Sequence, residues 1–145
     1  MIENIIKRIK AWLVPIKDKV VLLIDDSDID RRVAASILER RYHVLTAASG
    51  IEGLKVAREK LPDLILLDFM MPDMQGPDVC RVLKEDETTR HIPVIFLTSM
   101  DTPATVIDSF EEGAEIYLTK PISRFELVNQ VRATLELSCS KGGLC

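Results

Sequence analysis

The chain has 145 residues, the size of one ordinary domain built around a single buried core. Apolar residues make up 47% of it and charged residues 29%, and no apolar run approaches the roughly 20 residues that a membrane span needs. The net charge of −4 and the pI near 5.2 argue against the basic surface of direct nucleic-acid binders. We therefore expect one domain with no direct nucleic-acid partner.

The cysteines indicate the redox environment. Cys80, Cys139 and Cys145 are an odd number and lack the paired spacing of a metal site. Met1 is not followed by the uninterrupted apolar stretch of a secretory signal. A cytoplasmic location fits this pattern best, and we expect Cys80 to be a small core residue.

The first segment of the chain, residues 2–14, combines one apolar stripe with basic residues and ends before Pro15. We expect residues 1–17 to form an amphipathic helical extension that packs on the domain itself or on a second copy, giving a homodimer. A partner groove is an alternative, and membrane contact through residues 2–14 is less favoured because the segment is short. The stripe consists of Ile2, Ile5, Ile6, Ile9, Trp12 and Leu13, and the basic residues are Lys7, Arg8 and Lys10.

From Val20 onward, short apolar runs alternate with amphipathic segments. The runs are continuous rather than every other residue, which is typical of strands buried on both faces of a parallel sheet. Good helix N-caps at Asp28 and Ser49, a proline at Pro77 and a stop at Gly113 support helices between them. The runs cover residues 20–24, 44–47, 64–67, 94–97 and 116–118. The helical patterns are Ile29/Val33/Ile37, Ile51/Leu54/Ala57, Val79/Val82/Leu83, Val106/Ile107/Phe110 and Leu127/Val131/Leu135.

This alternation predicts an α/β fold in which five helices flank a five-stranded, doubly wound parallel sheet. We place the domain at residues 18–137 and a short polar tail at 138–145. Ligands of such sheets bind at the carboxyl ends of the strands. We therefore expect the functional residues at that edge of the sheet.

Polar side chains follow four of the five predicted strands. Asp25 and Asp26 follow the first, Asp68 the third and Lys120 the fifth. Thr98 follows the fourth, with Ser99 as the alternative if the strand register shifts by one. Two like charges ~4 Å apart repel by roughly 4 kcal/mol at an effective dielectric near 20, so three converging carboxylates need a counter-ion. An all-oxygen site suits Mg²⁺. With Asp68 as nucleophile, attack on phosphorus would give an acyl phosphate, with Lys120 and Thr98 contacting the transferring oxygens.

These elements together resemble the receiver domain of two-component response regulators. The resemblance runs from about Val20 to Leu137. It is carried by Asp25-Asp26 after the first strand, Asp68-Phe69-Met70-Met71-Pro72 after the third, Thr98 after the fourth, and the run from Gly113 to Pro121.

The resemblance implies a flavodoxin-like receiver fold and a role for each matching residue. Asp26, Asp68 and the Met70 carbonyl would ligate the metal directly, with Asp25 acting mainly through water. Thr98 and Tyr117 would form the switch pair, and the Lys120–Pro121 bond would be cis. The positions that tune hydrolysis would be Met70 and Met100, which predicts a long-lived phosphoprotein because neither side chain orients water well.

The resulting interpretation is a response regulator receiver, not an enzyme in the usual sense, that takes part in its own phosphotransfer and slow autodephosphorylation. Its partners would be a histidine kinase or histidine phosphotransfer protein and a downstream target protein, with the segment from Val106 to Leu135 reshaped for the target. Three alternatives stay open. They are a phosphorylation-independent scaffold, a fragment of a longer regulator with an output domain, and a magnesium-dependent phosphohydrolase, against which Met70 stands because that class has a second aspartate there.

Overall fold

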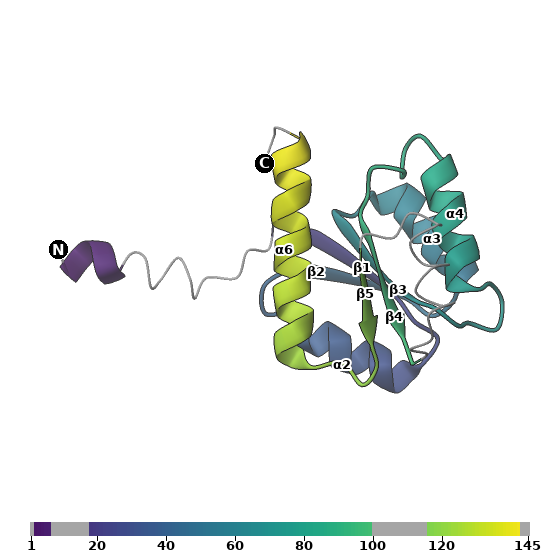
Figure 1. The fold of residues 1–145 in the computed structure, drawn as a ribbon, viewed down its shortest axis with the longest axis horizontal. Helices are drawn as coiled ribbons and strands as arrows, with labels where there is room; N and C mark the ends of the chain where they lie inside the picture. Colours follow the sequence, from purple (N-terminus) through teal and green to yellow (C-terminus); the bar gives the residue numbers. More distant parts are fainter. Residues whose placement is uncertain (1, 7–17, 100–115, 143–145) are drawn as a thin grey trace.

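The computed structural model describes residues 2–6, 18–99 and 116–142 (Figure 1). Its centre is one parallel sheet with the strand order β2-β1-β3-β4-β5. Every predicted strand is present, and four of the five extend one residue beyond the apolar run that predicted them. The strands are β1 (Val20–Ile24), β2 (His43–Ala47), β3 (Leu64–Asp68), β4 (Val94–Thr98) and β5 (Ile116–Thr119).

Helices cover both faces of this sheet, as the alternating pattern predicts. Helices α3 (Gly50–Lys60) and α4 (Gly76–Glu85) lie on one face, and α2 (Asp28–Leu38) and α6 (Arg124–Gly142) lie on the other (Figure 1). The doubly wound α/β fold is confirmed. The helix expected around Val106, Ile107 and Phe110, with its stop at Gly113, lies outside the described residues.

The continuous apolar runs explain why the sheet has two cores. Successive side chains of a strand point to opposite faces, so Leu22 and Ile24 pack with α3 and α4 while Val21 and Leu23 pack with α2 and α6. All four side chains have no exposed surface. Helix α3 lies so close to β1 that a Cβ on Gly53 would come within 2.8 Å of Ile24 Cγ1.

Helix α2 differs from the sequence prediction. Ile29 and Val33, expected on its buried face, are 74% and 52% exposed, while Ala34, Ala35 and Leu38 are buried. Two adjacent apolar rows run along this helix, and the row with small alanines allows close packing on the sheet. The N-cap also shifts from Asp28 to Ser27, whose Oγ accepts from Asp30 N at 3.3 Å. Ile51 of α3 is likewise 66% exposed.

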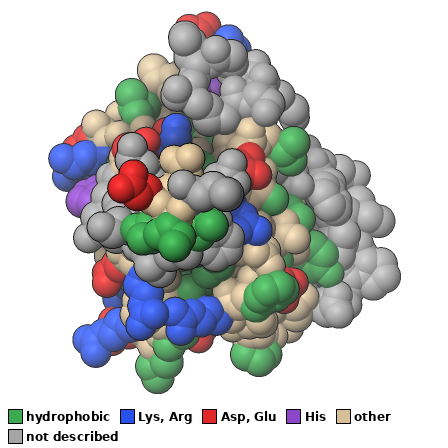
Figure 2. All heavy atoms as spheres, turned by 90° about the vertical axis from the view of Figure 1, so that its left-hand side faces the viewer, with side chains coloured by type: hydrophobic (Ala, Val, Ile, Leu, Met, Phe, Trp, Pro, Cys, Tyr) green, Lys and Arg blue, Asp and Glu red, His purple; other side chains and the backbone are tan. Residues whose placement is uncertain are grey.

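The two ends of the chain lie outside the alternating pattern. Residues 2–6 are helical, and Ile2, Ile5 and Ile6 are exposed. The rest of the expected N-terminal helix lies outside the described residues. Helix α6 continues to Gly142, through all of the described part of the predicted tail. Figure 2 shows the side of the molecule on which α6 lies, and Lys and Arg side chains gather in its lower part with hydrophobic side chains beside them.

Among the helices of the described residues, none has the length and apolar character to span a membrane. Cys80 of α4 is fully buried in the core, as predicted. Cys139 and Cys145 fall where side chains are not described.

Candidate functional site

The predicted acids converge at one edge of the sheet. β1 and β3 are neighbouring parallel strands, so Asp25 after β1 and Asp68 at the end of β3 lie side by side. One carboxylate oxygen from each of Asp25, Asp26 and Asp68 lies within 4.8 Å of the others. Asp25 and Asp68 are buried, whereas Asp26 is exposed. The structure therefore brings together the three acids that the sequence singled out.

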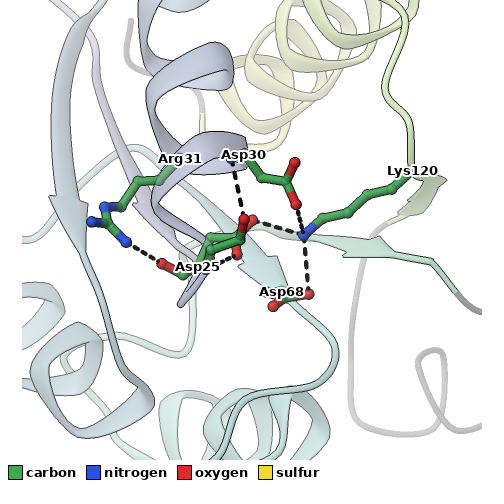
Figure 3. Close-up of polar contacts among 6 residues, drawn as sticks. Asp25, Asp30, Arg31, Asp68 and Lys120 are labelled. Atoms are coloured by element: carbon green, nitrogen blue, oxygen red, sulfur yellow. Dashed lines mark hydrogen bonds and ion pairs between the residues drawn. The ribbon is translucent and has the colours of Figure 1, made fainter.

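Lys120 reaches this cluster from the end of β5. Its ammonium donates to Asp25 Oδ2 at 2.8 Å and lies 3.5 Å from Asp68 Oδ1 (Figure 3). The Lys120 backbone N–H donates to Thr98 O at 2.7 Å, which ties the ends of β4 and β5 together. The Lys120–Pro121 bond is cis, as expected. Thr98 is buried at the end of β4, Tyr117 is half-buried on β5, and Met100 lies outside the described residues.

The loop between β1 and α2 is held by contacts that keep Asp25 in place. Asp25 Oδ1 accepts from Ser27 N at 2.9 Å, and Arg31 donates to the Asp25 carbonyl at 2.8 Å (Figure 3). Arg31 also pairs with Asp28 at 2.8 Å. Because Oδ1 is held by the backbone, Oδ2 is directed to Lys120.

The loop after β3 is anchored at both ends. Gly76 N donates to Phe69 O at 2.8 Å, and a Cβ on Gly76 would come within 2.9 Å of Phe69 Cα. Asp73 accepts from Gly50 N at 3.1 Å and from Ile51 N at 2.9 Å, so it caps α3 from this loop. These backbone hydrogen bonds lower the pKa of Asp73. Met70, within this loop, has a side chain that is 52% exposed.

The electrostatics of the cluster follow from burial and crowding. Burial, followed by the charge of Asp25, raises the pKa of Asp68 to about 7, although Lys120 acts in the opposite direction. Burial of the Lys120 ammonium alone would lower its pKa, but its hydrogen bond to Asp25 and the charge of Asp68 outweigh that effect and raise it. The site thus holds a permanent cation beside carboxylates that repel one another.

One contact was not predicted. Asp30, in the first turn of α2, accepts from Lys120 Nζ at 3.1 Å. The sequence held a signal for it, because a helix that starts directly after strand-end acids places its first turn at the same edge of the sheet. The roles of Arg31 and Asp73 depend on loop conformations that no residue spacing specifies.

Comparison with known proteins identifies the family. The family model of the response regulator receiver domain matches residues 21–132 of the chain. The chain belongs to the response regulator receiver family. It is a receiver domain of two-component signalling, and such domains are not classical enzymes.

Individual relatives agree with this assignment. The chain is 45% identical over 114 residues to the response regulator PleD of Caulobacter vibrioides, covering 78% of this chain and 25% of PleD. It is 34% identical over 118 residues to the polar-differentiation response regulator DivK of Brucella ovis, covering 81% of this chain and 96% of DivK. A putative response regulator from Chloroflexus aurantiacus superposes with a TM-score of 0.79 at 32% identity, covering 83% of this chain and 99% of that one. The chain spans about a quarter of the length of PleD.

The raised pKa of Asp68 generates a pH-dependent prediction. Because the folded-state pKa of about 7 exceeds the ordinary value of 3.8, ionising Asp68 costs stability as the pH rises between these values. In a chelator-treated sample at pH 8, Asp68→Asn should therefore raise the free energy of unfolding by roughly 1–3 kcal/mol. At pH 4 this gain should largely disappear.

Urea unfolding at the two pH values checks this, with Asp78→Asn on α4 as the control for removing a carboxylate. A gain at pH 4 as large as at pH 8 would contradict the account.

Proposed function

We propose that Asp68 accepts a phosphoryl group from a histidine kinase or histidine phosphotransfer protein, and that the phosphorylated receiver changes its affinity for a downstream target protein. The observation that carries this proposal is the position of one buried carboxylate. Asp68 ends a central strand, with the Lys120 ammonium 3.5 Å away and Asp25 and Asp26 beside it. We place the protein in the cytoplasm, because three cysteines without paired spacing fit a reducing environment.

The proposed step is a displacement at phosphorus. A carboxylate oxygen of Asp68 attacks, the new Asp68 O–P bond forms, and the bond from phosphorus to the donor breaks. The leaving group, a histidine nitrogen or the acetate of acetyl phosphate, takes the electron pair. Lys120 contacts a phosphoryl oxygen, and the Thr98 hydroxyl bonds another.

The donor set fits Mg²⁺. The cluster consists of carboxylate oxygens within 4.8 Å of one another. Burial and the charge of Asp25 raise the pKa of Asp68, so a bound cation would stabilise its ionised form. Asp26, Asp68 and the Met70 carbonyl would hold the ion, with Asp25 acting mainly through water. When bound, the cation neutralises charge on the transferring oxygens.

We further propose that Thr98 and Tyr117 transmit the phosphorylation to the target-binding surface. Thr98 ends β4 at the site, and Phe96 of the same strand pairs with Tyr117 of β5. A shift of the Thr98 hydroxyl toward the phosphoryl group favours an inward Tyr117 ring, which is a population shift between two packings. Nuclear magnetic resonance of the Tyr117 ring, with and without the phosphoryl group, tests this step.

Two alternatives are separated by specific observations. A phosphorylation-independent scaffold would not need Lys120 paired with the acids, and this pairing supports a working phosphoacceptor. A piece of a longer regulator is compatible with the relatives. The chain covers 25% of PleD and 48% of the DNA-binding regulator RpaA of Synechocystis. An attached output domain would change the target but not the chemistry at Asp68.

Labelling tests the proposal itself. Incubation with acetyl phosphate and Mg²⁺ should add one phosphoryl mass to the wild type, measured by intact-protein mass spectrometry. Asp68→Asn and omission of Mg²⁺ should each abolish the addition, because nucleophile and ion are both required. Labelling of Asp68→Asn at the wild-type level would refute the assignment.

The lifetime of the phosphoprotein should depend on Met70. Its side chain, which cannot orient an attacking water, is partly exposed beside the site. Met70→Asn should shorten the lifetime several-fold, measured by timed phosphoprotein gels, while Met70→Leu should leave it close to wild type. An unchanged or longer lifetime in the asparagine variant would show that water positioning here is not limiting.

We propose that residues 2–14 pack on the receiver itself or on a second copy of it, because the exposed Ile2, Ile5 and Ile6 need cover. Deleting residues 1–15 should leave labelling of Asp68 intact but change the mass in light scattering or the melting temperature. If both stay unchanged, an outside partner covers the stripe. Sedimentation with anionic liposomes would then detect membrane contact.

A further inference from the structure

Lys120 is shared among three carboxylates. Its ammonium lies 2.8 Å from Asp25 Oδ2, 3.1 Å from Asp30 Oδ2 and 3.5 Å from Asp68 Oδ1, and the lysine side chain is only 14% exposed. An ammonium has three N–H donors. Two of them are donated in hydrogen bonds, to Asp25 and Asp30, while Asp68 lies at 3.5 Å as an ion pair. A phosphoryl group at Asp68 therefore meets an ammonium that two other carboxylates already hold, and it competes with them for Lys120.

Asp30 is the contact that is released most easily. Its side chain is 46% exposed, against 1% for Asp25 and 9% for Asp68. Water can solvate a half-exposed carboxylate when its partner leaves, whereas a buried carboxylate without its cation costs far more. The Asp25 carboxylate is also fixed by Ser27 N, and Asp30 has no such second anchor among the described contacts.

A simpler role for Asp30 is as a favourable charge at the N-terminus of α2. Asp28 provides the comparison, because it is also an acid in the first turn of this helix. Its side chain pairs with Arg31 at 2.8 Å and with Arg32 at 3.2 Å, and it makes no described contact with Lys120. Asp30 is instead directed into the site (Figure 3). The two residues thus share the effect on the helix and differ in the contact to Lys120.

We propose that Asp30 is a positioning residue that holds Lys120 in the unphosphorylated receiver and competes with the phosphoryl group for its ammonium. This inference rests on the proposed phosphorylation of Asp68. Asp30 adds a negative charge next to the acid cluster, so it favours a bound cation and disfavours an incoming phosphoryl group. It thereby restrains the activated state while supporting the metal.

The two effects give predictions of opposite sign for Asp30→Asn. The affinity for Mg²⁺ should fall, because one negative charge is lost and Lys120 draws closer to Asp25 and Asp68. At saturating Mg²⁺, the affinity for beryllofluoride, a phosphoryl analogue, should rise, because Lys120 is freed to contact it. Each change should be about threefold to tenfold, the range expected for one partly exposed charge pair.

Calorimetric titration measures the Mg²⁺ affinity, and fluorine nuclear magnetic resonance measures beryllofluoride binding. Asp28→Asn is the matched control and should stay within about twofold of wild type in both, since it removes the same helix-terminal charge, has no described contact with Lys120, and keeps a side-chain oxygen that can accept from Arg31. Asparagine is tolerated at helix starts, so both variants should fold, and thermal melts verify this.

The outcomes distinguish a failure of the proposed role of Asp30 from a failure of the proposed phosphorylation of Asp68. If Asp30→Asn behaves like Asp28→Asn, or if its affinities for Mg²⁺ and beryllofluoride both fall, Asp30 does not have the proposed role. The proposed phosphorylation of Asp68 is unaffected by that result. If the wild type binds Mg²⁺ but no beryllofluoride, the proposed function itself is wrong. Competition is supported if the two affinities shift in opposite directions in Asp30→Asn and stay near wild type in Asp28→Asn.

Discussion

The crowding of carboxylates around one ammonium is the constraint on which the site depends. Asp25 and Asp68 are buried at the ends of neighbouring strands, and Lys120 reaches both from the end of β5. Burial, followed by the charge of Asp25, raises the pKa of Asp68 even though Lys120 lies beside it. A site with more carboxylates than cations favours binding of a divalent cation, which would in turn offset the charge of a phosphoryl group. The fold creates this excess of negative charge because β1, β3 and β5 end at the same edge of the sheet.

Hydrogen bonds within the loops hold the cluster in place. Arg31 and Ser27 fix the turn after β1, and Asp73 attaches the loop after β3 to the start of α3. Such hydrogen bonds hold charged groups where solvent-exposed loops would let them separate. The apolar strands beneath them are buried on both faces, so the strand ends cannot shift without disturbing two cores.

Much of this was predictable from the sequence, for identifiable reasons. Continuous runs such as residues 64–67 have few alternatives to a buried parallel strand, and parallel strands bring Asp25, Asp68 and Lys120 to one edge whatever their separation along the chain. The burial of α2 was not predictable from spacing. Ile29 and Val33 are more apolar than Ala34 and Ala35, yet the smaller residues face the sheet because they allow closer approach. Asp30 was missed because its role depends on the direction of a side chain across the site, which residue type alone does not give.

The most direct measurement for the central claim is the chemical location of the phosphoryl group. Borohydride reduces an aspartyl phosphate to homoserine, which peptide mass spectrometry can place in the sequence. After labelling with acetyl phosphate and Mg²⁺, we predict homoserine at position 68 and at no other aspartate of the cluster. Homoserine at position 25 or 26, or phosphate retained on a serine or threonine, would contradict it.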